Sequence, residues 1–223
     1  MNDPSFHDAR TPGGRALLLR ADRLVLHDRM GQRLFDGLNL DIGAGLTFVR
    51  GGEQRGKSVL LRLLAGAIQP DAGALNWSPA GPAQAGAASV FLFDGDGDGA
   101  EADPVAVSTW LQQQSQRHSG WNWPLLQELL QDFALGEHLD KGLHMLSTGS
   151  RRKVALAAAF ASGASLTLLE KPFAALDARS RGLLGELLQE AAAHPARAWV
   201  LADYQLPAML SPVDLAATLD LGD

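Results

Sequence analysis

The sequence predicts an α/β protein whose mostly parallel sheet is flanked by helices and interrupted by a helical insert. Short apolar runs typical of strands alternate along the chain with longer segments typical of helices, which is the order that builds a parallel sheet. The stretch 105–145 has helical character only, so we expect it to form the insert. The length of 223 residues and the hydrophobic content of 46% suit one globular domain with its own core.

The N-terminal half contains the first expected strands. Residues 1–15 are predicted to be a polar tail. Residues 17–26 and 34–42 alternate or run apolar, as paired strands do, and a third short run covers 46–49. From Ser58 onward the apolar spacing changes to one that indicates a buried helix. Strand, glycine-rich loop and helix therefore follow one another without a gap.

The C-terminal half completes the alternation. The expected elements are a strand at 89–93, an acidic glycine-rich loop at 94–104, the helical stretch 105–145, a helix at 151–161, a strand at 166–169, a helix after Asp177 and a strand at 199–202. We therefore expect a single domain over 16–223, with a core of about 16–94 and 151–223 and a helical subdomain of about 95–150.

Composition and charge exclude several classes of function. The chain has 25 acidic and 19 basic residues, a balance that argues against a nucleic-acid-binding surface. It has no cysteine, which excludes thiol catalysis and cysteine-ligated zinc. The first residues lack the pattern of a signal peptide, and the longest uncharged stretch, 72–93, is broken by Pro79 and Pro82. We therefore expect a soluble protein.

The strongest local motif is the segment 51–58, which fits G-x-x-x-x-G-K-[ST] in full. Glycines let backbone N–H groups approach phosphate oxygens, and the helix that follows adds the positive end of its dipole. Lys57 would contact the β- and γ-phosphates, and Ser58 would hold Mg²⁺. A chance glycine turn is the alternative, which the strand before the motif and the helix after it disfavour. The expected ATP-binding residues are Gly51, Gly52, Glu53, Gln54, Arg55, Gly56, Lys57, Ser58 and Val59.

Four further segments resemble motifs of ATP-binding cassette (ABC) proteins. Leu146-Ser147-Thr148-Gly149-Ser150 resembles the LSGGQ signature, Leu168-Leu169-Glu170-Lys171-Pro172 the Walker B strand, Ala175-Leu176-Asp177 the D-loop, and Leu34–Leu40 the strand before the phosphate loop. Taken singly, Ser147 and Asp177 would indicate only helix caps, and Glu170 a charge at a strand end. In this order and spacing they make the resemblance specific, and it covers about 16–223.

The resemblance implies a RecA-like P-loop NTPase core with an inserted helical subdomain. It implies a homodimer or heterodimer of two cassettes packed head to tail, in which Ser147, Thr148, Gly149 and Ser150 touch the ATP of the partner. Mg²⁺ would be held by Ser58, Glu170 and Asp94, the last at the position of the family's glutamine. It also implies a transmembrane permease on another chain, with this chain cytoplasmic at the inner face of the cell membrane.

The sequence departs from the family at the positions that cleave ATP. Lys171 stands where the family has its catalytic glutamate, and a charged lysine has no lone pair to accept a proton. Losing a general base typically costs about 10²- to 10⁴-fold in rate. Asp203 stands where the family has its switch histidine. A register shift that makes Glu170 the base is disfavoured by the position of Pro172.

Two hypotheses explain these departures. Lys171 and Asp203 could form an ion pair of reversed polarity that occupies the space of the attacking water, and Lys171 could also hold the γ-phosphate. In the alternative, selection on the site has relaxed and both residues are without a role.

Three lesser features leave alternatives open. Residues 94–99 match half of an EF-hand loop, but Val105 stands where the bidentate glutamate is required, so we expect a solvated acidic loop. Trp121 and Trp123 are equally consistent with partner docking and with packing inside the insert. An aromatic residue for adenine is lacking near 27–29, where His27 or Arg29 could stack instead.

The function predicted from the sequence is that of the ATP-binding subunit of an ABC-type transporter, which couples ATP binding to transport by a separate permease. Hydrolysis at its own site would be impaired. The alternative is a nucleotide-gated regulatory or scaffold module with little or no ATPase activity. A non-transport ABC protein of DNA repair or translation is disfavoured, because neither a long coiled-coil insert nor a tandem cassette is present.

Overall fold

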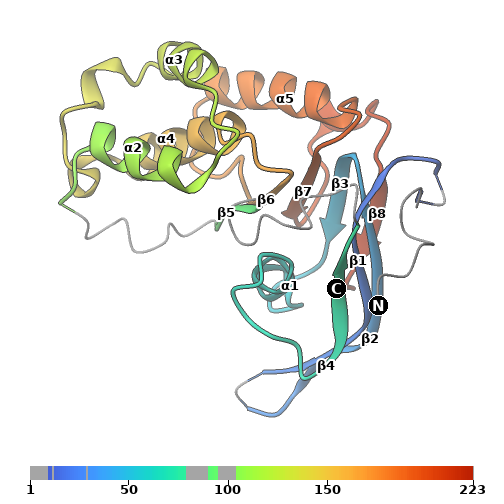
Figure 1. Ribbon diagram of the computed structural model, residues 1–223. Helices are drawn as coiled ribbons and strands as arrows, with labels where there is room; N and C mark the ends of the chain where they lie inside the picture. The colour runs from blue at the N-terminus through green and yellow to red at the C-terminus, as the bar shows by residue number, and fades with distance from the viewer. Residues whose placement is uncertain (1–9, 12, 29, 79–89, 95–103, 223) are drawn as a thin grey trace.

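The computed structural model describes residues 10–11, 13–28, 30–78, 90–94 and 104–222. It consists of two sheets and a cap of helices (Figure 1). The larger sheet is entirely parallel, with the strand order β5-β6-β7-β3-β8. Its strands are β5 (Val90–Phe93), β6 (Leu166–Glu170), β7 (Ala198–Asp203), β3 (Gly45–Arg50) and β8 (Ala217–Asp220).

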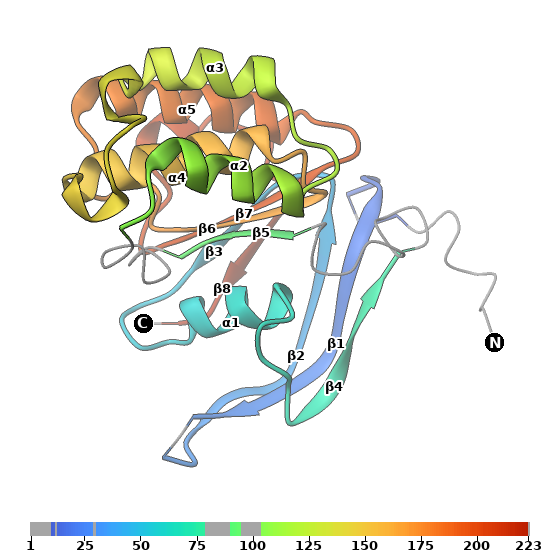
Figure 2. The same ribbon diagram turned by 60° about the vertical axis from the view of Figure 1, so that its left-hand side comes forward.

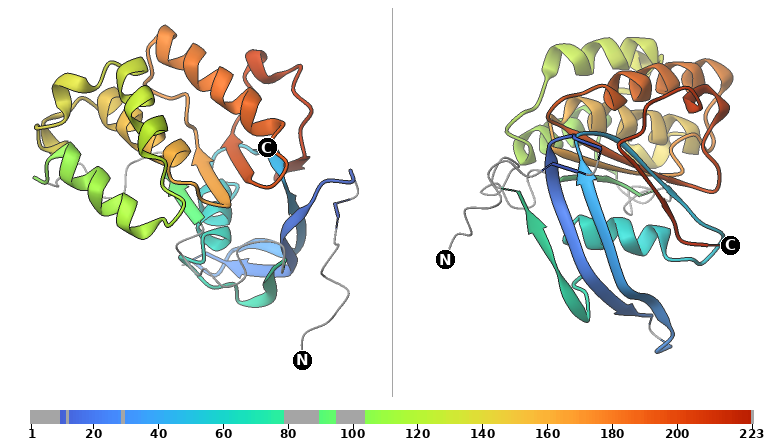
Figure 3. Two further views of the ribbon diagram at one scale, coloured as in Figure 1. Left: turned by 45° about the horizontal axis from the view of Figure 1, so that its top comes forward. Right: turned by 90° about the vertical axis from the view of Figure 1, so that its right-hand side faces the viewer.

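The smaller sheet is antiparallel, with the order β2-β1-β4. Its strands are β1 (Leu17–His27), β2 (Arg33–Gly43) and β4 (Ala72–Trp77). Helix α1 (Lys57–Leu64) lies between the two sheets (Figure 2; Figure 3, right). Its leucines share one core with the inward side chains of β1 and β2.

The other helices cover the opposite face of the parallel sheet (Figure 2). They are α2 (Val107–Arg117), α3 (Trp123–Asp132), α4 (Thr148–Ala161) and α5 (Ala178–Ala192), with short 3-10 helices η4 (Gly136–His138), η5 (Leu143–Met145) and η6 (Ala208–Leu210). In the part of the chain that the structure describes, no helix has both the length and the apolar character needed to cross a membrane.

The parallel strands separate two hydrophobic cores. Successive residues of a strand point to opposite faces. Along β7, Val200 and Ala202 belong to the core that contains α1, whereas Trp199 and Leu201 belong to the core beneath α4 and α5. Both faces of the sheet are therefore buried, as expected for a parallel sheet.

Polar side chains define where three helices begin. The side-chain oxygens of Asn122, Ser147 and Asp177 accept hydrogen bonds from backbone N–H groups in the first turns of α3, α4 and α5. The boundary between α2 and α3 is also a point of close approach, because a Cβ on Gly163 would lie 2.0 Å from the carbonyl oxygen of Gly120. Only glycine fits there, so the segment before α3 rests directly on the turn after α4.

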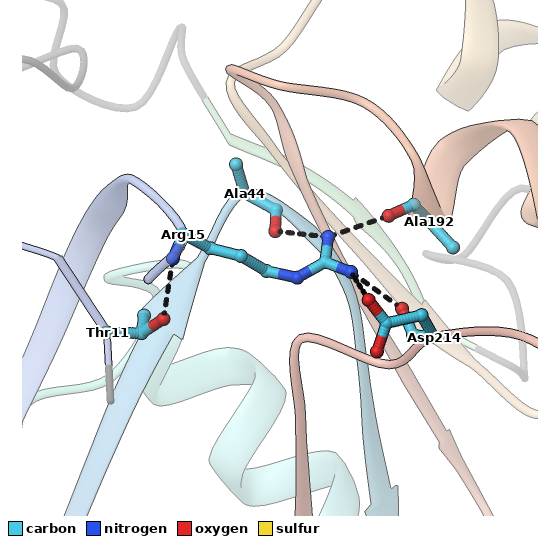
Figure 4. A network of polar contacts seen from close by, with 5 residues as sticks. All are labelled: Thr11, Arg15, Ala44, Ala192 and Asp214. Atoms are coloured by element: carbon cyan, nitrogen blue, oxygen red, sulfur yellow. Dashed lines mark hydrogen bonds and ion pairs between the residues drawn. The ribbon is translucent and has the colours of Figure 1, made fainter. Parts of the chain in front are cut away.

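Arg15 fastens the start of β1 to the far side of the parallel sheet (Figure 4). Its guanidinium donates to the carbonyl oxygens of Ala192 at 2.8 Å and Ala44 at 3.3 Å. It also donates to the carbonyl and side-chain oxygens of Asp214, both at 2.8 Å. The last residue of the expected polar tail is thus attached to the core.

The predicted α/β class with a parallel sheet is confirmed, and two strands were missed. Strand β4 is mostly exposed at the edge of its sheet and carries no apolar alternation in its sequence. Strand β8 is a four-residue edge strand. The stretch 105–145 contains two α-helices and two 3-10 helices rather than continuous helix, because the segment with Gly120 and Asn122 interrupts it.

Candidate ATP-binding site

The phosphate loop joins β3 to α1, and its conformation depends on glycine. Gly56 has a φ of +84°, and a Cβ there would lie 3.0 Å from Cζ of Phe35. The residue is therefore restricted both by its backbone and by the ring packed against it. Helix α1 begins at the next residue with no side-chain cap, so its first N–H groups are free to bind an anion.

Lys57 is buried at the first position of α1. Its ammonium donates to the carbonyl oxygens of Gly51 at 2.5 Å and Gly52 at 2.6 Å. Burial lowers the pKa of Lys57, and the charge of Lys171 lowers it further. The side chain thus lies along the inside of the loop, where a phosphate-binding lysine is required.

Ser58 and Glu170 meet across 112 positions of sequence. The Ser58 hydroxyl donates to Oε1 of Glu170 at 2.5 Å, and Glu170 is buried at the end of β6. A hydroxyl and a carboxylate are the oxygen donors that Mg²⁺ accepts together with nucleotide phosphates. The described residues contain no group of three His, Asp or Glu side chains that could hold a metal alone. This pair therefore fits a metal that arrives with the nucleotide.

Asp94, the third expected Mg²⁺ ligand, follows β5 and pairs with Arg62 on α1 at 3.4 Å. It is not among the described residues that line the cavity. Its role as a ligand stays a prediction.

A cavity of about 310 Å³ opens at the carboxyl ends of the parallel strands. It is lined by residues 53–59 of the loop and α1, together with Leu34, Glu170, Lys171 and Tyr204. Crevices at this end of open parallel sheets are the usual ligand sites of α/β folds. Seven of the nine expected ATP-binding residues thus line one cavity, and Gly51 and Gly52 accept hydrogen bonds from Lys57 beneath it.

Lys171 follows β6, and Asp203 is the last residue of the neighbouring strand β7, in which Ala202 pairs with Glu170. Lys171 has a φ of +43°, uncommon for a non-glycine residue. Its N–H donates to the carbonyl of Ala202 at 2.8 Å, and its carbonyl accepts from Arg152 at 2.5 Å. The lysine is therefore held by its backbone beside the cavity. The ion pair with Asp203 stays a prediction.

Tyr204 lines the cavity although no motif in the sequence indicated a role for it. Its ring centroid lies 4.3 Å from Nζ of Lys57 and 4.9 Å from Nζ of Lys171. Its hydroxyl donates to Oε1 of Glu53 at 3.3 Å. The one available signal was that the only tyrosine of the chain directly follows a strand end at the binding edge of the sheet.

The signature segment lies apart from this cavity. Ser147 caps α4 by accepting from the N–H of Ser150 at 3.1 Å, and its hydroxyl donates to Oγ of Ser150 at 3.0 Å. Ser147 and Thr148 are exposed, and no signature residue is among the described residues that line the cavity. Within one chain the structure therefore does not bring these two sets of residues together.

The signature helix instead contacts the D-loop. A Cβ on Gly149 would lie 2.7 Å from the carbonyl oxygen of Ala175. Lys153 of α4 pairs with Asp177 at 3.1 Å, and Asp177 also caps α5 through the N–H of Ser180 at 2.8 Å. These hydrogen bonds lower the pKa of Asp177 to about 2, with the Ser180 N–H as the largest cause.

The lesser sequence features have mixed outcomes. His27 is hydrogen-bonded to Asp71 at 2.9 Å, and it is not among the described residues that line the cavity. Arg29 and most of the EF-hand-like segment lie outside the described residues. Trp121 packs against the hydrophobic core and His118, whereas Trp123 is 47% exposed. Packing therefore accounts for the first tryptophan.

The fold and this cavity define a P-loop nucleotide-binding protein. A glycine loop leads from a parallel strand into a helix, and a lysine, a hydroxyl and a carboxylate gather at the start of that helix. The ABC transporter family model matches residues 35–174. The chain belongs to the ABC transporter family, as an ATP-binding component of such a transporter.

Several curated relatives are similar over most of their length. The cytochrome c biogenesis ATP-binding export protein CcmA of Pseudomonas savastanoi pv. phaseolicola is 34% identical over 155 residues, which cover 67% of this chain and 71% of the relative. CcmA of Idiomarina loihiensis is 34% identical over 178 residues, covering 78% of this chain and 79% of the relative. The aliphatic sulfonates import ATP-binding protein SsuB 1 of Rhizobium johnstonii is 34% identical over 162 residues, which cover 71% of this chain and 58% of the relative.

Solved structures show the same fold at lower identity. An ABC transporter ATP-binding protein from Pyrococcus furiosus superposes with a TM-score of 0.71 at 17% identity, covering 91% of this chain and 96% of that one. An inward-facing metal-chelate type ABC transporter superposes with a TM-score of 0.67 at 22% identity, covering 88% of this chain and 77% of that one.

Proposed function

We propose that this subunit binds ATP with Mg²⁺ in the cavity beside Lys57 and hydrolyses it slowly at that site. The observation that carries the proposal is Lys171, which lines the cavity directly after Glu170. The described residues there include no carboxylate at the position of the family's base. Glu170, the buried acid directly before Lys171, already accepts a hydrogen bond from the Ser58 hydroxyl at 2.5 Å.

Different residues of the cavity would bind the phosphates and the Mg²⁺ ion. The N–H groups of the loop and the ammonium of Lys57 bind and orient the phosphates. Ser58 and Glu170 would hold Mg²⁺, which supplies charge neutralisation at the phosphate oxygens when bound. Lys171 adds a positive charge but cannot accept a proton from water. Binding and orientation are thus provided, and proton removal is not.

A head-to-tail dimer with a second cassette completes this proposal. Support comes from the signature, which caps an exposed helix start away from the cavity of its own chain. A helix N-terminus is suited to bind an anion, so the γ-phosphate held by a partner fits there. The dimer would act with a separate membrane permease and would therefore lie at the inner face of the cell membrane.

Turnover of the purified subunit tests the catalytic part of the proposal. Wild-type ATP turnover should be at least about 100-fold slower than that of Lys171→Glu combined with Asp203→His, because a missing general base costs about 10²- to 10⁴-fold. Lys171→Glu alone should recover part of the rate. The matched control is Lys141→Glu, since Lys141 contacts His138 outside the cavity. Rapid hydrolysis by the wild-type subunit alone would refute slow turnover.

The alternative is a nucleotide-gated regulatory or scaffold module with little or no ATPase activity. The same lysine supports it, because a site that binds without cleaving suits a switch. Turnover measured with and without an active partner cassette separates the two functions. If ATP turnover by the pair requires this subunit, the subunit is part of the transport ATPase. If this subunit only changes the rate of ATP turnover by its partner, it is a regulatory module.

A further inference from the structure

We infer that Tyr204 holds Lys57 and Lys171 as a pair of cations that recognises the terminal phosphate of a nucleoside triphosphate, so that the site favours ATP over ADP. Tyr204 is a positioning residue in this inference, and the lysines are the groups that contact phosphate. The inference rests on the proposed ATP binding in this cavity, and it adds a specificity that the proposed slow hydrolysis does not require.

The first argument is geometric. Side chains from three separate elements meet here. The ring of Tyr204 follows β7, and it is contacted by Lys57 of α1 and by Lys171, which follows β6. Both ammonium groups lie within 5 Å of the ring centroid, at 4.3 and 4.9 Å. Cations within about 6 Å of an aromatic face are attracted by its quadrupole. One side chain therefore positions both lysines.

The second argument is the way in which Tyr204 itself is held. Its hydroxyl donates to Glu53 of the phosphate loop at 3.3 Å, and its N–H donates to the side chain of Asp203 at 2.7 Å. The ring is thereby fixed between the loop and the end of β7. With its hydroxyl bound to the loop and its backbone N–H bound at the end of β7, Tyr204 keeps the two lysines in a constant relation to the loop.

The third argument is electrostatic. Two ammonium groups that contact one ring, at 4.3 and 4.9 Å from its centroid, repel each other because like charges this close interact unfavourably. The cavity acids are engaged elsewhere: Glu170 accepts from Ser58, and Glu53 accepts from Tyr204. An added anion between the lysines would relieve the repulsion. The cavity is thus arranged for a group of high negative charge.

The identity of that group follows from the position of the pair. A phosphate-loop lysine reaches the β- and γ-phosphates of a bound nucleotide. The ammonium of Lys171 contacts the same tyrosine ring as that of Lys57 but comes from the opposite wall of the cavity. It is therefore placed to contact the outermost phosphate. A diphosphate offers no group there and leaves Lys171 without that contact. The second lysine therefore adds affinity for the triphosphate only.

Equilibrium binding of ATP, a non-hydrolysable ATP analogue and ADP in the presence of Mg²⁺ tests the inference. The wild-type chain should bind ATP and the analogue about tenfold more tightly than ADP, a factor that corresponds to about 1.4 kcal/mol. Lys171→Met and Tyr204→Leu should each reduce that ratio about tenfold. Tyr204→Phe, which keeps the ring and removes the hydroxyl bond to Glu53, should reduce the ratio less than Tyr204→Leu does.

Controls separate specificity from loss of structure. Lys141→Met removes a lysine outside the cavity and should keep the wild-type ratio. ADP binding reports whether each variant retains a folded site. An equal loss of ATP and ADP affinity in Tyr204→Leu would overturn the inference, because the tyrosine would then act on the site as a whole. A wild-type ratio near one would overturn it as well. Rapid hydrolysis by the wild type, in contrast, would refute only the proposed slow turnover.

Discussion

The two walls of the cavity differ in how closely they follow the family. The wall formed by the loop and α1 matches the phosphate-binding motif at every defined position, with a glycine at positive φ and a buried lysine in place. The opposite wall, formed by the ends of β6 and β7, carries Lys171 and Tyr204. In the proposed site, phosphate binding and proton removal would reside on separate elements, so one could change while the other is kept.

The largest expected effect comes from the loop wall. Lys57→Met should weaken ATP binding about 100-fold, because hydrogen bonds to a charged group are worth about 1.5–3 kcal/mol each. Isothermal titration with ATP measures the loss, and Lys141→Met is the matched control. If Lys57→Met bound ATP as tightly as the wild type, the assignment of binding to this wall would be wrong.

The next effect is on the signature side, which the second cassette would contact. Gly149→Ala should lower the free energy of unfolding by about 1–3 kcal/mol, because the new Cβ would lie 2.7 Å from the carbonyl oxygen of Ala175. Urea unfolding provides the measurement. Binding of ATP to the single chain should be unaffected, since Gly149 lies outside the cavity.

Gly182→Ala is the control for that substitution. Gly182 lies in α5, and nothing stands within 4 Å of an added Cβ. Removing a helical glycine without a clash typically adds about 0.5–1 kcal/mol of stability. Changes of opposite sign in the free energy of unfolding for Gly149→Ala and Gly182→Ala would support the close contact between the signature and the D-loop. Equal effects would contradict it.

The smallest effect concerns the charge at the D-loop. The pKa of Asp177 is lowered from 3.8 to about 2, first by the Ser180 N–H and then by Lys153. A carboxylate with a lowered folded-state pKa contributes stability that is present above about pH 4 and lost as the pH falls towards 2. Asp177→Asn should therefore show a weaker fall in unfolding midpoint across this window.

Chemical denaturation at a series of pH values measures that fall. Asp140→Asn, in an exposed turn after η4, is the control. A variant at Asp177 that loses stability as steeply as the wild type between pH 4 and 2 would show that the contacts of Asp177 in α4 and α5 do not stabilise its charge.

The loop wall could be predicted from sequence because its chemistry is local. Gly51 to Ser58 are contiguous, and the apolar runs beside them fix a strand and a helix. The opposite wall carries Lys171 and Tyr204, each of which is more than a hundred positions from Lys57 in the sequence. That the ring of Tyr204 contacts both Lys57 and Lys171 depends on strand order and side-chain direction. Neither the strand order nor the side-chain direction can be read from the spacing of residues in the sequence.

The same distinction applies to the fold. The predicted α/β class was confirmed because buried strands such as β6 and β7 read as continuous apolar runs. Strand β4 is mostly exposed and β8 has only four residues, so the pairing that makes them strands comes from their neighbours. Ser147 shows a third case, because one side chain is both the cap of α4 and part of the signature.

The Arg15 guanidinium has a mechanical consequence for nucleotide binding. It ties the residues just before β1 to Ala192 at the end of α5 and to Asp214 between η6 and β8. The antiparallel sheet is therefore joined to the parallel sheet at this point as well as through α1. Attachments at separate places oppose rotation of one sheet against the other, so we expect the two sheets around the cavity to respond to nucleotide binding as one rigid unit.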